Sequence, residues 1–198
     1  MRPEKRKERY ERILDAAREQ FRAYGYRKTS LEEIAEAAGV GKATLYHYTT
    51  GKDELFGEVL HRHYDEYLER LRTELGQVST APAKLRRYAL VLLDQHRRVR
   101  EGLVVPRNSE QESFPFIVQH LHKFAVMEIA ILRDILSDGV AAGVFRKVNE
   151  ELVATLLFAS FKGMIAQACQ NQDHHEEIID QFLSVLLNGL VAGADDRN

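Results

Sequence analysis

The sequence predicts an all-α protein, in which a three-helix helix-turn-helix domain at the amino end is joined to a larger helical domain. Apolar residues recur every three or four positions along most of the chain, which is the period of one helix face. No segment sustains the alternation of apolar and polar residues that indicates a strand. Glycine and proline, 12 and 4 of 198 residues, are too sparse for a fold with many tight turns.

The first expected helix covers about residues 6–24, and Gly25 ends it because glycine leaves the helical conformation readily. The second begins with Ser30 and Glu33, which have the spacing of a capping box, and ends at Gly39 after barely more than two turns. The apolar stripe of the first helix consists of Tyr10, Ile13, Leu14, Ala17, Phe21 and Tyr24.

A third short helix is expected from about Lys42 to Tyr48, with Leu45 as its buried anchor. Two short helices joined by a tight turn that contains glycine form a helix-turn-helix unit. A much longer fourth helix starts in the run 50–53 and continues to a linker at 76–82.

Beyond this linker the apolar spacing stays helical. We expect a loop at 102–113, and place the boundary between two domains, residues 1–52 and 53–198, at the start of the fourth helix. The remaining helices are expected at about 83–101, 114–142 (continuous or broken once), 150–171 and 175–192.

The net charge of −2 conceals an uneven distribution. Residues 1–52 hold 12 Lys/Arg against 8 Asp/Glu, a charge of +4, whereas 53–198 hold 16 against 22, a charge of −6. A basic run near the amino end is either a phosphate-attracting arm or an ordinary solvated run. It comprises Arg2, Lys5, Arg6, Lys7 and Arg9.

The segment Leu31-Glu-Glu-Ile-Ala-Glu-Ala-Ala-Gly-Val-Gly-Lys-Ala-Thr-Leu-Tyr-His-Tyr48, followed by Gly51-Lys-Asp-Glu-Leu-Phe56, resembles the amino-terminal domain of the TetR family of repressors. The resemblance covers residues 8–56, about a quarter of the chain. It implies a homodimeric transcription regulator that binds a palindromic double-stranded DNA operator and is released when a small molecule binds the carboxy-terminal domain. Activation instead of repression stays open.

The recognition helix of such a unit packs by one face and presents the other to base edges in the major groove. Leu45 serves the packing face. Thr49 stands where the family commonly has phenylalanine, so an apolar contact between the third and fourth helices is missing or made by other residues. The outward face offers Lys42, Ala43, Thr44 and His47.

Five further residues are candidates for contact with the DNA backbone. The hydroxyls of Tyr46 and Tyr48 suit phosphate oxygens, and the resemblance assigns these positions to backbone contact. It also implies that Lys52, at the start of the fourth helix, touches phosphate. Thr29 or Ser30 can do so at the second helix, or can serve only as a cap.

The two last helices are apolar around more than half of their circumference. Either one face packs on a second copy of the chain, as the resemblance implies, or both faces are core. The predicted interface comprises Leu156, Gly163, Ile179, Phe182, Leu183, Leu186 and Leu190.

The resemblance also implies an effector cavity among the fourth to eighth helices. Its aromatic candidates favour an apolar or aromatic effector, although an aromatic residue at helical spacing is more often core. The candidates are Tyr67, Tyr88, Leu92, His96, Phe116, His120, Phe124, Phe158 and Phe161.

Nothing in the sequence predicts an enzyme, a metal site or a cofactor. Cys169 is the single cysteine, and Glu58 with His61 is the only Glu-x-x-His pair, whereas a di-iron bundle needs two. No apolar run approaches the roughly twenty residues of a membrane span and no signal peptide precedes the first helix, which favours a cytoplasmic protein. A helical adaptor that binds another protein remains the alternative.

Overall fold

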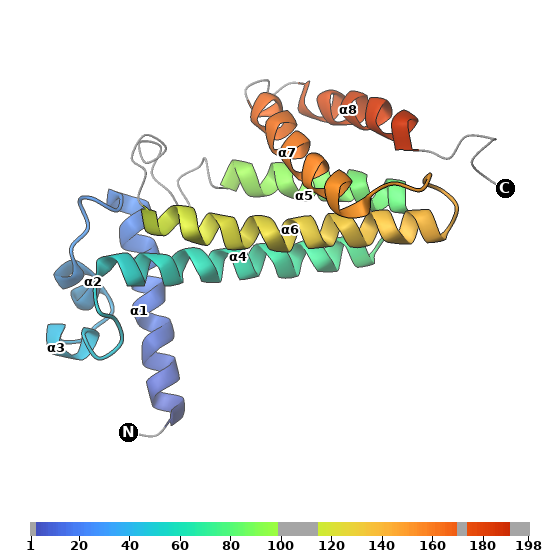
Figure 1. The fold of residues 1–198 in the computed structure, drawn as a ribbon. Coiled ribbons are helices and arrows are strands. Elements are labelled where there is room, and N and C mark those ends of the chain that lie inside the picture. Colours follow the sequence, from blue (N-terminus) through green and yellow to red (C-terminus); the bar gives the residue numbers. More distant parts are fainter. Residues whose placement is uncertain (1–2, 99–114, 170–173, 191–198) are drawn as a thin grey trace. The chain divides into compact units, whose positions relative to one another are not determined.

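The computed structural model describes the backbone of residues 3–98, 115–169 and 174–190, and their side chains except at 3 and 115–121. These residues form helices without a β-strand, which confirms the all-α prediction (Figure 1). The helices are α1 (Pro3–Tyr24), α2 (Leu31–Ala37), α3 (Lys42–Leu45), α4 (Lys52–Gly76), α5 (Ala81–Arg98), α6 (Pro115–Ala141), α7 (Glu150–Ala168) and α8 (His175–Leu190).

The sequence placed every one of these helices, with small differences at their ends. α3 is a single turn that stops at Leu45, and the following residues up to Thr49 continue as hydrogen-bonded turns. α6 is continuous from Pro115 to Ala141. The loop expected at 102–113 lies outside the described residues.

The chain divides into two compact units. The first comprises Met1–Glu66 with Arg98–Leu121, and the second Tyr67–Arg97 with His122–Asn198. α4 therefore contributes to both units. Its amino-terminal part belongs to the core of the first unit through Leu55, Phe56, Val59 and Leu60.

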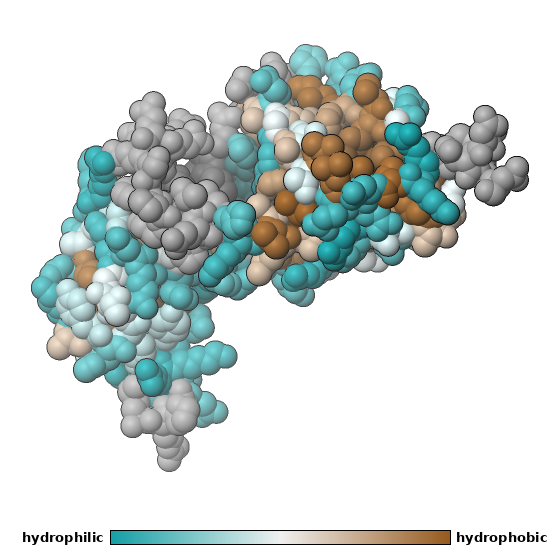
Figure 2. Space-filling view, in the orientation of Figure 1, coloured by the Kyte–Doolittle hydropathy of each residue, from teal (hydrophilic) through white to brown (hydrophobic). Residues whose placement is uncertain are grey.

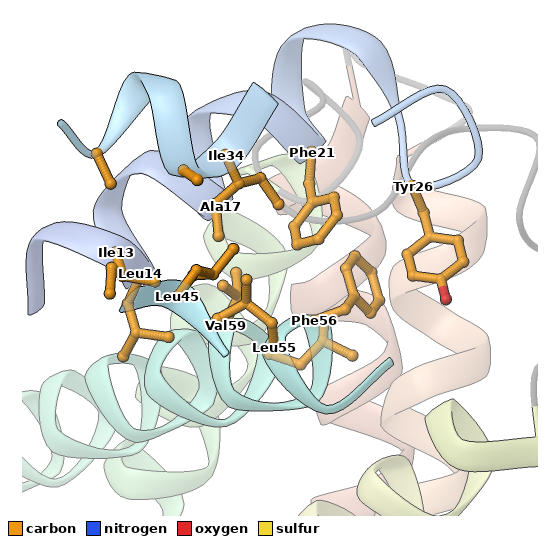
Figure 3. Packing of buried hydrophobic residues seen from close by; sticks show 13 residues of the cluster. Ile13, Leu14, Ala17, Phe21, Tyr26, Ile34, Leu45, Leu55, Phe56 and Val59 are labelled. Atoms are coloured by element: carbon orange, nitrogen blue, oxygen red, sulfur yellow. The ribbon is translucent and has the colours of Figure 1, made fainter. Parts of the chain in front are cut away.

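The core of the first unit joins α1, α2, α3 and the start of α4 (Figure 3). Phe21, Tyr26 and Phe56 pack ring against ring, with centroids 4.9–5.9 Å apart. Ile13, Ile34 and Leu45 are fully buried, so each of the first three helices is anchored by an aliphatic side chain. Burying a side chain of this size contributes roughly 1.5–3 kcal/mol, which holds the single turn of α3 in place.

The second unit packs the end of α4 with α5, α6, α7 and α8. α6 and the turn after it meet closely, since a Cβ built on Gly139 would lie 2.2 Å from the ring of Phe145. By length and composition alone α7 is apolar enough to cross a membrane, which the uninterrupted apolar runs of the sequence did not suggest. Part of α7 packs in the core of the second unit, since Ala154, Leu157 and Phe161 are buried.

Candidate nucleic-acid interface and buried polar cluster

The turn between α2 and α3 fixes the orientation of α3. Gly39 has φ +64°, which favours glycine, and the amide of Val40 donates to the Ala35 carbonyl at 2.9 Å. Leu45 is buried, and the opposite side of the turn faces solvent. The predicted base-reading residues Lys42, Ala43 and His47 are exposed there, and Thr44 is half-buried beside them.

Lys42 forms an ion pair with Glu32 of α2 in the free protein. The pair raises the pKa of Lys42 and lowers the pKa of Glu32, chiefly through their side-chain hydrogen bond. Both side chains are more than half exposed, so water weakens the pair.

Tyr46 and Tyr48 differ in their surroundings, although the sequence predicted the same role for both. Tyr46 is 48% exposed. The ring of Tyr48 stacks on Tyr10 of α1 with centroids 6.0 Å apart, and the Arg6 guanidinium lies 6.0 Å from its centroid. The Tyr48 hydroxyl is buried without a hydrogen-bond partner.

The start of α2 does not present the predicted Thr29 contact. Thr29 is only 2% exposed, and its hydroxyl donates to the carbonyls of Gly25 and Gln20 at 2.8 and 3.2 Å. Thr29 is therefore a buried turn residue whose hydroxyl is occupied by these two carbonyls. Ser30 forms the predicted capping box with Glu33, and its side chain is half-buried.

Lys52 also lies differently from the expected phosphate contact. Its Nζ donates to the carbonyls of Tyr26 and Thr29 at 2.9 and 3.0 Å and lies 4.5 Å from the Tyr26 ring centroid. Burial, together with the hydrogen bond that the Tyr26 hydroxyl donates to Asp53, raises the pKa of Tyr26. These contacts tie the start of α4 to the loop between α1 and α2.

Thr49 replaces an apolar contact with a polar cap of α4. Its hydroxyl donates to the Gly51 carbonyl at 2.8 Å and lies 3.2 Å from Glu54 Oε2. The same carboxylate oxygen accepts from the amide and the hydroxyl of Thr50 at 2.5 and 2.7 Å. These bonds lower the pKa of Glu54. Thr49 therefore makes polar contacts at the start of α4, at the position where the family commonly has an apolar side chain.

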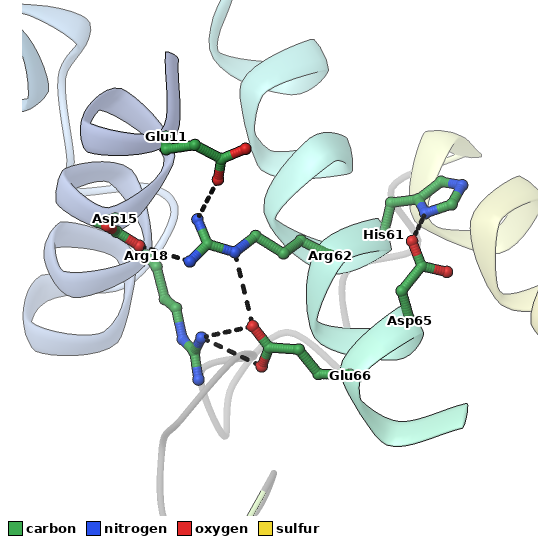
Figure 4. A network of polar contacts seen from close by, with 7 residues as sticks. All are labelled: Glu11, Asp15, Arg18, His61, Arg62, Asp65 and Glu66. Carbon is green, nitrogen blue, oxygen red and sulfur yellow. Dashed lines mark hydrogen bonds and ion pairs between the residues drawn. The ribbon is translucent and has the colours of Figure 1, made fainter. Parts of the chain in front are cut away.

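Sequence reasoning missed an ion-pair network between α1 and α4 (Figure 4). Arg62 binds Glu11 and Asp15 of α1 at 3.2 and 2.7 Å, and its Nε lies 3.5 Å from Glu66. Arg18 of α1 reaches the same Glu66 at 3.4 Å. Only the pair of Arg62 and Glu66 has a sequence signal, the i,i+4 spacing.

In the second unit, two predicted effector residues converge on a carboxylate that the sequence analysis did not identify. The hydroxyls of Tyr67 and Tyr88 donate to Glu128 Oε2 at 3.0 and 2.7 Å, and Lys162 Nζ lies 2.9 Å from Oε1. Glu128 is fully buried, whereas the Lys162 side chain is 39% exposed. A signal was present, because Glu128 stands on the apolar stripe of α6 between Phe124 and Leu132.

The other predicted effector residues surround this cluster or lie near it in sequence. Phe161 packs on Tyr88 with centroids 5.0 Å apart, and Lys162 lies 5.2 Å from the ring centroid of Phe158. Leu92 and Phe124 are buried and His96 is half-buried. The side chains of Phe116 and His120 lie outside the described residues.

The predicted dimer residues divide between surface and core. Leu156 and Gly163 are exposed, and Phe182 and Leu186 are half-buried. The remaining three pack in the protomer's own core: Ile179, Leu183 and Leu190.

Exposed apolar side chains nevertheless gather over α7 and α8 (Figure 2). Leu152 and Leu156 of α7 are 56% and 57% exposed, and Val185 of α8 is 76% exposed. An apolar surface of this kind is typical of a protein interface.

Among the described residues no group of three or more His, Cys, Asp or Glu side chains could hold a metal ion. Cys169 is buried, as an inert core thiol would be.

Comparison with known proteins covers both units. A family model described as "Bacterial regulatory proteins, tetR family" matches residues 13–59, and one described as "QacR-like protein, C-terminal region" matches residues 63–192. The chain is 23% identical over 188 residues to the fatty acid metabolism regulator protein of Bacillus subtilis, covering 91% of this chain and 95% of the relative. It is 27% identical to the transcriptional repressor NicS of Pseudomonas putida, covering 92% and 84%.

Solved structures share the fold. A transcriptional regulator from Cytophaga hutchinsonii superposes with a TM-score of 0.74 at 23% identity, covering 91% of this chain and 97% of the other.

Proposed function

This chain belongs to the tetR family of bacterial regulatory proteins, and from this premise we propose that it is a homodimeric repressor. The dimer leaves a palindromic operator when a small molecule binds the second unit. It is a DNA-binding transcription regulator, since the relatives across both matched regions are regulators and not enzymes. As a regulator of transcription it acts in the cytoplasm, where its DNA lies.

The observation that carries the proposal is the exposed side of α3. Leu45 anchors this turn in the core, while Lys42, Ala43, Tyr46 and His47 stay open to solvent. These side chains suit a major groove: Lys42 can bind guanine or phosphate and Ala43 can meet a thymine methyl. Thr29 is left out of this DNA-binding surface because it is buried. Lys52 holds the start of α4 on the α1–α2 loop, so its proposed effect on DNA binding is exerted through the position of α4.

Dimerisation follows from how little DNA one such turn can read. Two copies on a palindrome double the contacts when the half-sites lie about 34–36 Å, or a multiple, apart. The apolar surface of α7 and α8 supports the pairing, since Leu152, Leu156 and Val185 would be removed from water by a second copy.

The proposed effector has an apolar or aromatic body and binds among Tyr67, Tyr88 and Phe161. α4 carries Tyr67 in the second unit and Lys52 in the first, so a ligand that prefers one position of α4 shifts the population away from the DNA-binding state. The ligand needs only a difference in affinity between the two states.

The proposal is tested with duplexes selected from a random pool by the full-length protein. Binding measured by fluorescence anisotropy should weaken with salt, with a log–log slope near −4 to −5 if a dimer neutralises about four to six phosphates. Tyr46→Ala should lower affinity at least about tenfold, because Tyr46 lies on the proposed DNA face.

Tyr24→Ala is the matched control, since Tyr24 is an exposed tyrosine of the same unit, 61% accessible and outside α3. It should bind as the wild type does. A salt slope near zero, or equal affinities of the two variants, would contradict the proposed function.

A further inference from the structure

A surface cleft lies between the amino-terminal part of α1 and the α3 region. It is lined by Arg6, Arg9, Thr44, His47 and Tyr48. Each of these side chains can donate a hydrogen bond, and none is acidic. Thr44 and His47 belong to the predicted DNA face, whereas Arg6 and Arg9 come from the basic run whose role the sequence left open.

The two arginines differ from three other arginines of the same unit. Arg18, Arg22 and Arg62 are held by carboxylates of α1 or α4. Within the described part of the chain, neither Arg6 nor Arg9 forms an ion pair, and Arg6 instead lies over the Tyr48 ring. Their guanidinium groups are thus available to an anion, for which they offer paired donors.

Tyr48 adds a buried hydroxyl whose lack of a hydrogen-bond partner costs free energy of folding. Its hydroxyl is shielded from water and makes no hydrogen bond, although an unsatisfied buried hydroxyl costs about 1–3 kcal/mol. The Arg6 side chain lies over the same ring, so a shift of Arg6 towards an anion would also change the surroundings of this hydroxyl.

We infer that this cleft binds a backbone phosphodiester of the operator, flanking the bases that α3 reads. Arg6 and Arg9 supply the charge, and the Tyr48 hydroxyl gains a phosphate oxygen as its partner. The inference rests on the proposed function, and it adds a second element, α1, to the DNA-binding surface. Because phosphate contacts carry no sequence information, the cleft sets affinity and register and not base preference.

The test compares Arg9→Gln and Arg6→Gln with Lys7→Gln, which removes the same charge from the same helix outside the cleft. All are measured on a selected duplex and on a random-sequence duplex. Each lost phosphate contact reduces the magnitude of the log–log salt slope by about 0.9, so the loss of one contact in each protomer reduces the slope of a dimer by about 1.8. The two cleft variants should show this smaller salt slope, and their affinity should fall by a similar factor on both duplexes. Lys7→Gln should show neither effect.

Tyr48→Phe gives a second readout that does not depend on charge. It should keep or raise the melting temperature of the free protein, since the hydroxyl it removes has no partner there. It should still weaken binding to both duplexes several-fold. A Tyr48→Phe variant that binds as tightly as the wild type overturns the role of the hydroxyl.

The source of the phosphate is checked by adding inorganic phosphate at constant ionic strength. No displacement of DNA at constant ionic strength supports a site that needs the polymer, whereas displacement of DNA by millimolar phosphate would indicate a free-anion site and contradict the proposal. If the wild type binds neither duplex, the proposed function fails. If it binds and the cleft variants match Lys7→Gln, only this inference fails.

Discussion

The ammonium group of Lys52 lies on the backbone of Tyr26, with Nζ 2.9 Å from the Tyr26 carbonyl oxygen and 4.5 Å from the centroid of its ring. A second carbonyl, that of Thr29, accepts from the same group at 3.0 Å. One side chain therefore satisfies two carbonyls of the α1–α2 loop and fixes that loop on the first turn of α4.

We expect Lys52→Met to lower the free energy of unfolding by roughly 1–3 kcal/mol, because it removes hydrogen bonds from a charged donor and leaves two carbonyls unsatisfied. Thermal and urea unfolding followed by circular dichroism measure this loss. Lys28→Met, on the exposed surface of the same loop, should stay within about 0.5 kcal/mol of the wild type. Equal free energies of unfolding for the two variants would contradict the stabilising role of the hydrogen bonds between Lys52 and the α1–α2 loop.

Lys52 and Thr29 also mark the limit of the sequence analysis. Helical periodicity and capping signals placed both residues correctly at the starts of α4 and α2, because these signals depend on neighbours in sequence. The direction of a long lysine side chain depends on the loop opposite it, which lies more than twenty residues away in sequence. The sequence could not therefore distinguish a phosphate contact from a tertiary hydrogen bond.

Tyr10 predicts how the first unit responds to alkaline pH. Burial and the neighbouring Glu58 raise the pKa of Tyr10 from 10.0 to about 12 in the folded protein. Below pH 10 the contribution of Tyr10 to the free energy of unfolding is fully present. It is lost as the pH rises to about 12, because the Tyr10 hydroxyl ionises at a lower pH in the unfolded chain than in the folded protein. The stability advantage of the wild type over Tyr10→Phe should therefore shrink across this range in urea titrations.

Tyr24→Phe serves as the control for the alkaline series. Tyr24 lies at the exposed end of the same helix, so Tyr24→Phe removes a tyrosine hydroxyl without altering the contacts of Tyr10. A constant advantage of the wild type over Tyr10→Phe would argue against the raised pKa.

Glu54 predicts the response to acid. Hydrogen bonds from Thr50 and Thr49 hold the pKa of Glu54 below its ordinary value of 4.5. A lowered pKa in the folded state stabilises the protein above the unfolded value, and this contribution is lost as the pH falls through the folded value. Glu54→Gln should thus be less stable than the wild type at neutral pH, and the difference should narrow below about pH 4.5.

Glu36→Gln is the appropriate comparison, since Glu36 is an exposed carboxylate of α2. We expect its free energy of unfolding at neutral pH to be close to that of the wild type, because substitutions of exposed side chains usually change stability little. If Glu54→Gln keeps its full deficit in acid, the cap does not depend on the charge of the carboxylate.

Gly163 tests the proposed dimer surface directly. It is exposed on α7, and an added Cβ would meet nothing within 4 Å in the protomer. Within one protomer, Gly163→Ala should stabilise the helix by about 0.5–1 kcal/mol. If the partner's helix approaches there, the same methyl group weakens the dimer, and we expect its dissociation constant to rise at least about tenfold in sedimentation equilibrium, or roughly 1.4 kcal/mol.

Gly139→Ala separates this effect from a general intolerance of side chains at glycine positions. Its Cβ would lie 2.2 Å from the Phe145 ring and 2.9 Å from Ala81 Cβ, so the protomer itself should be destabilised. A Gly163→Ala protein that dimerises as the wild type does would place the interface elsewhere on the chain.

The networks around Glu128 and Arg62 show which features the sequence hides. Apolar spacing gives the helices and most of their buried faces, because burial repeats with the helix period. A buried charge interrupts this pattern at one position, and its partners come from other helices. Glu128 was visible as a polar residue on an apolar stripe, but its bonds to Tyr67, Tyr88 and Lys162 required the packed structure.

The last prediction concerns the unequal burial of Glu128 and Lys162, 0% and 39% exposed. Lys162→Met leaves the carboxylate in the core without this cation, and breaking a buried pair in this way costs roughly 3 kcal/mol. Glu128→Gln instead leaves the Lys162 ammonium, which reaches water. The amide oxygen of the new glutamine can still accept hydrogen bonds from Tyr67 and Tyr88, so we expect the free energy of unfolding to fall by only about 1 kcal/mol.

The double variant should recover part of the loss of Lys162→Met, because neither charge is then left without the other. Urea unfolding at neutral pH gives all three values, and the midpoint, not the slope, should change. A greater cost for Glu128→Gln than for Lys162→Met would mean that the tyrosine hydroxyls alone, and not the lysine, keep this carboxylate in the core of the second unit.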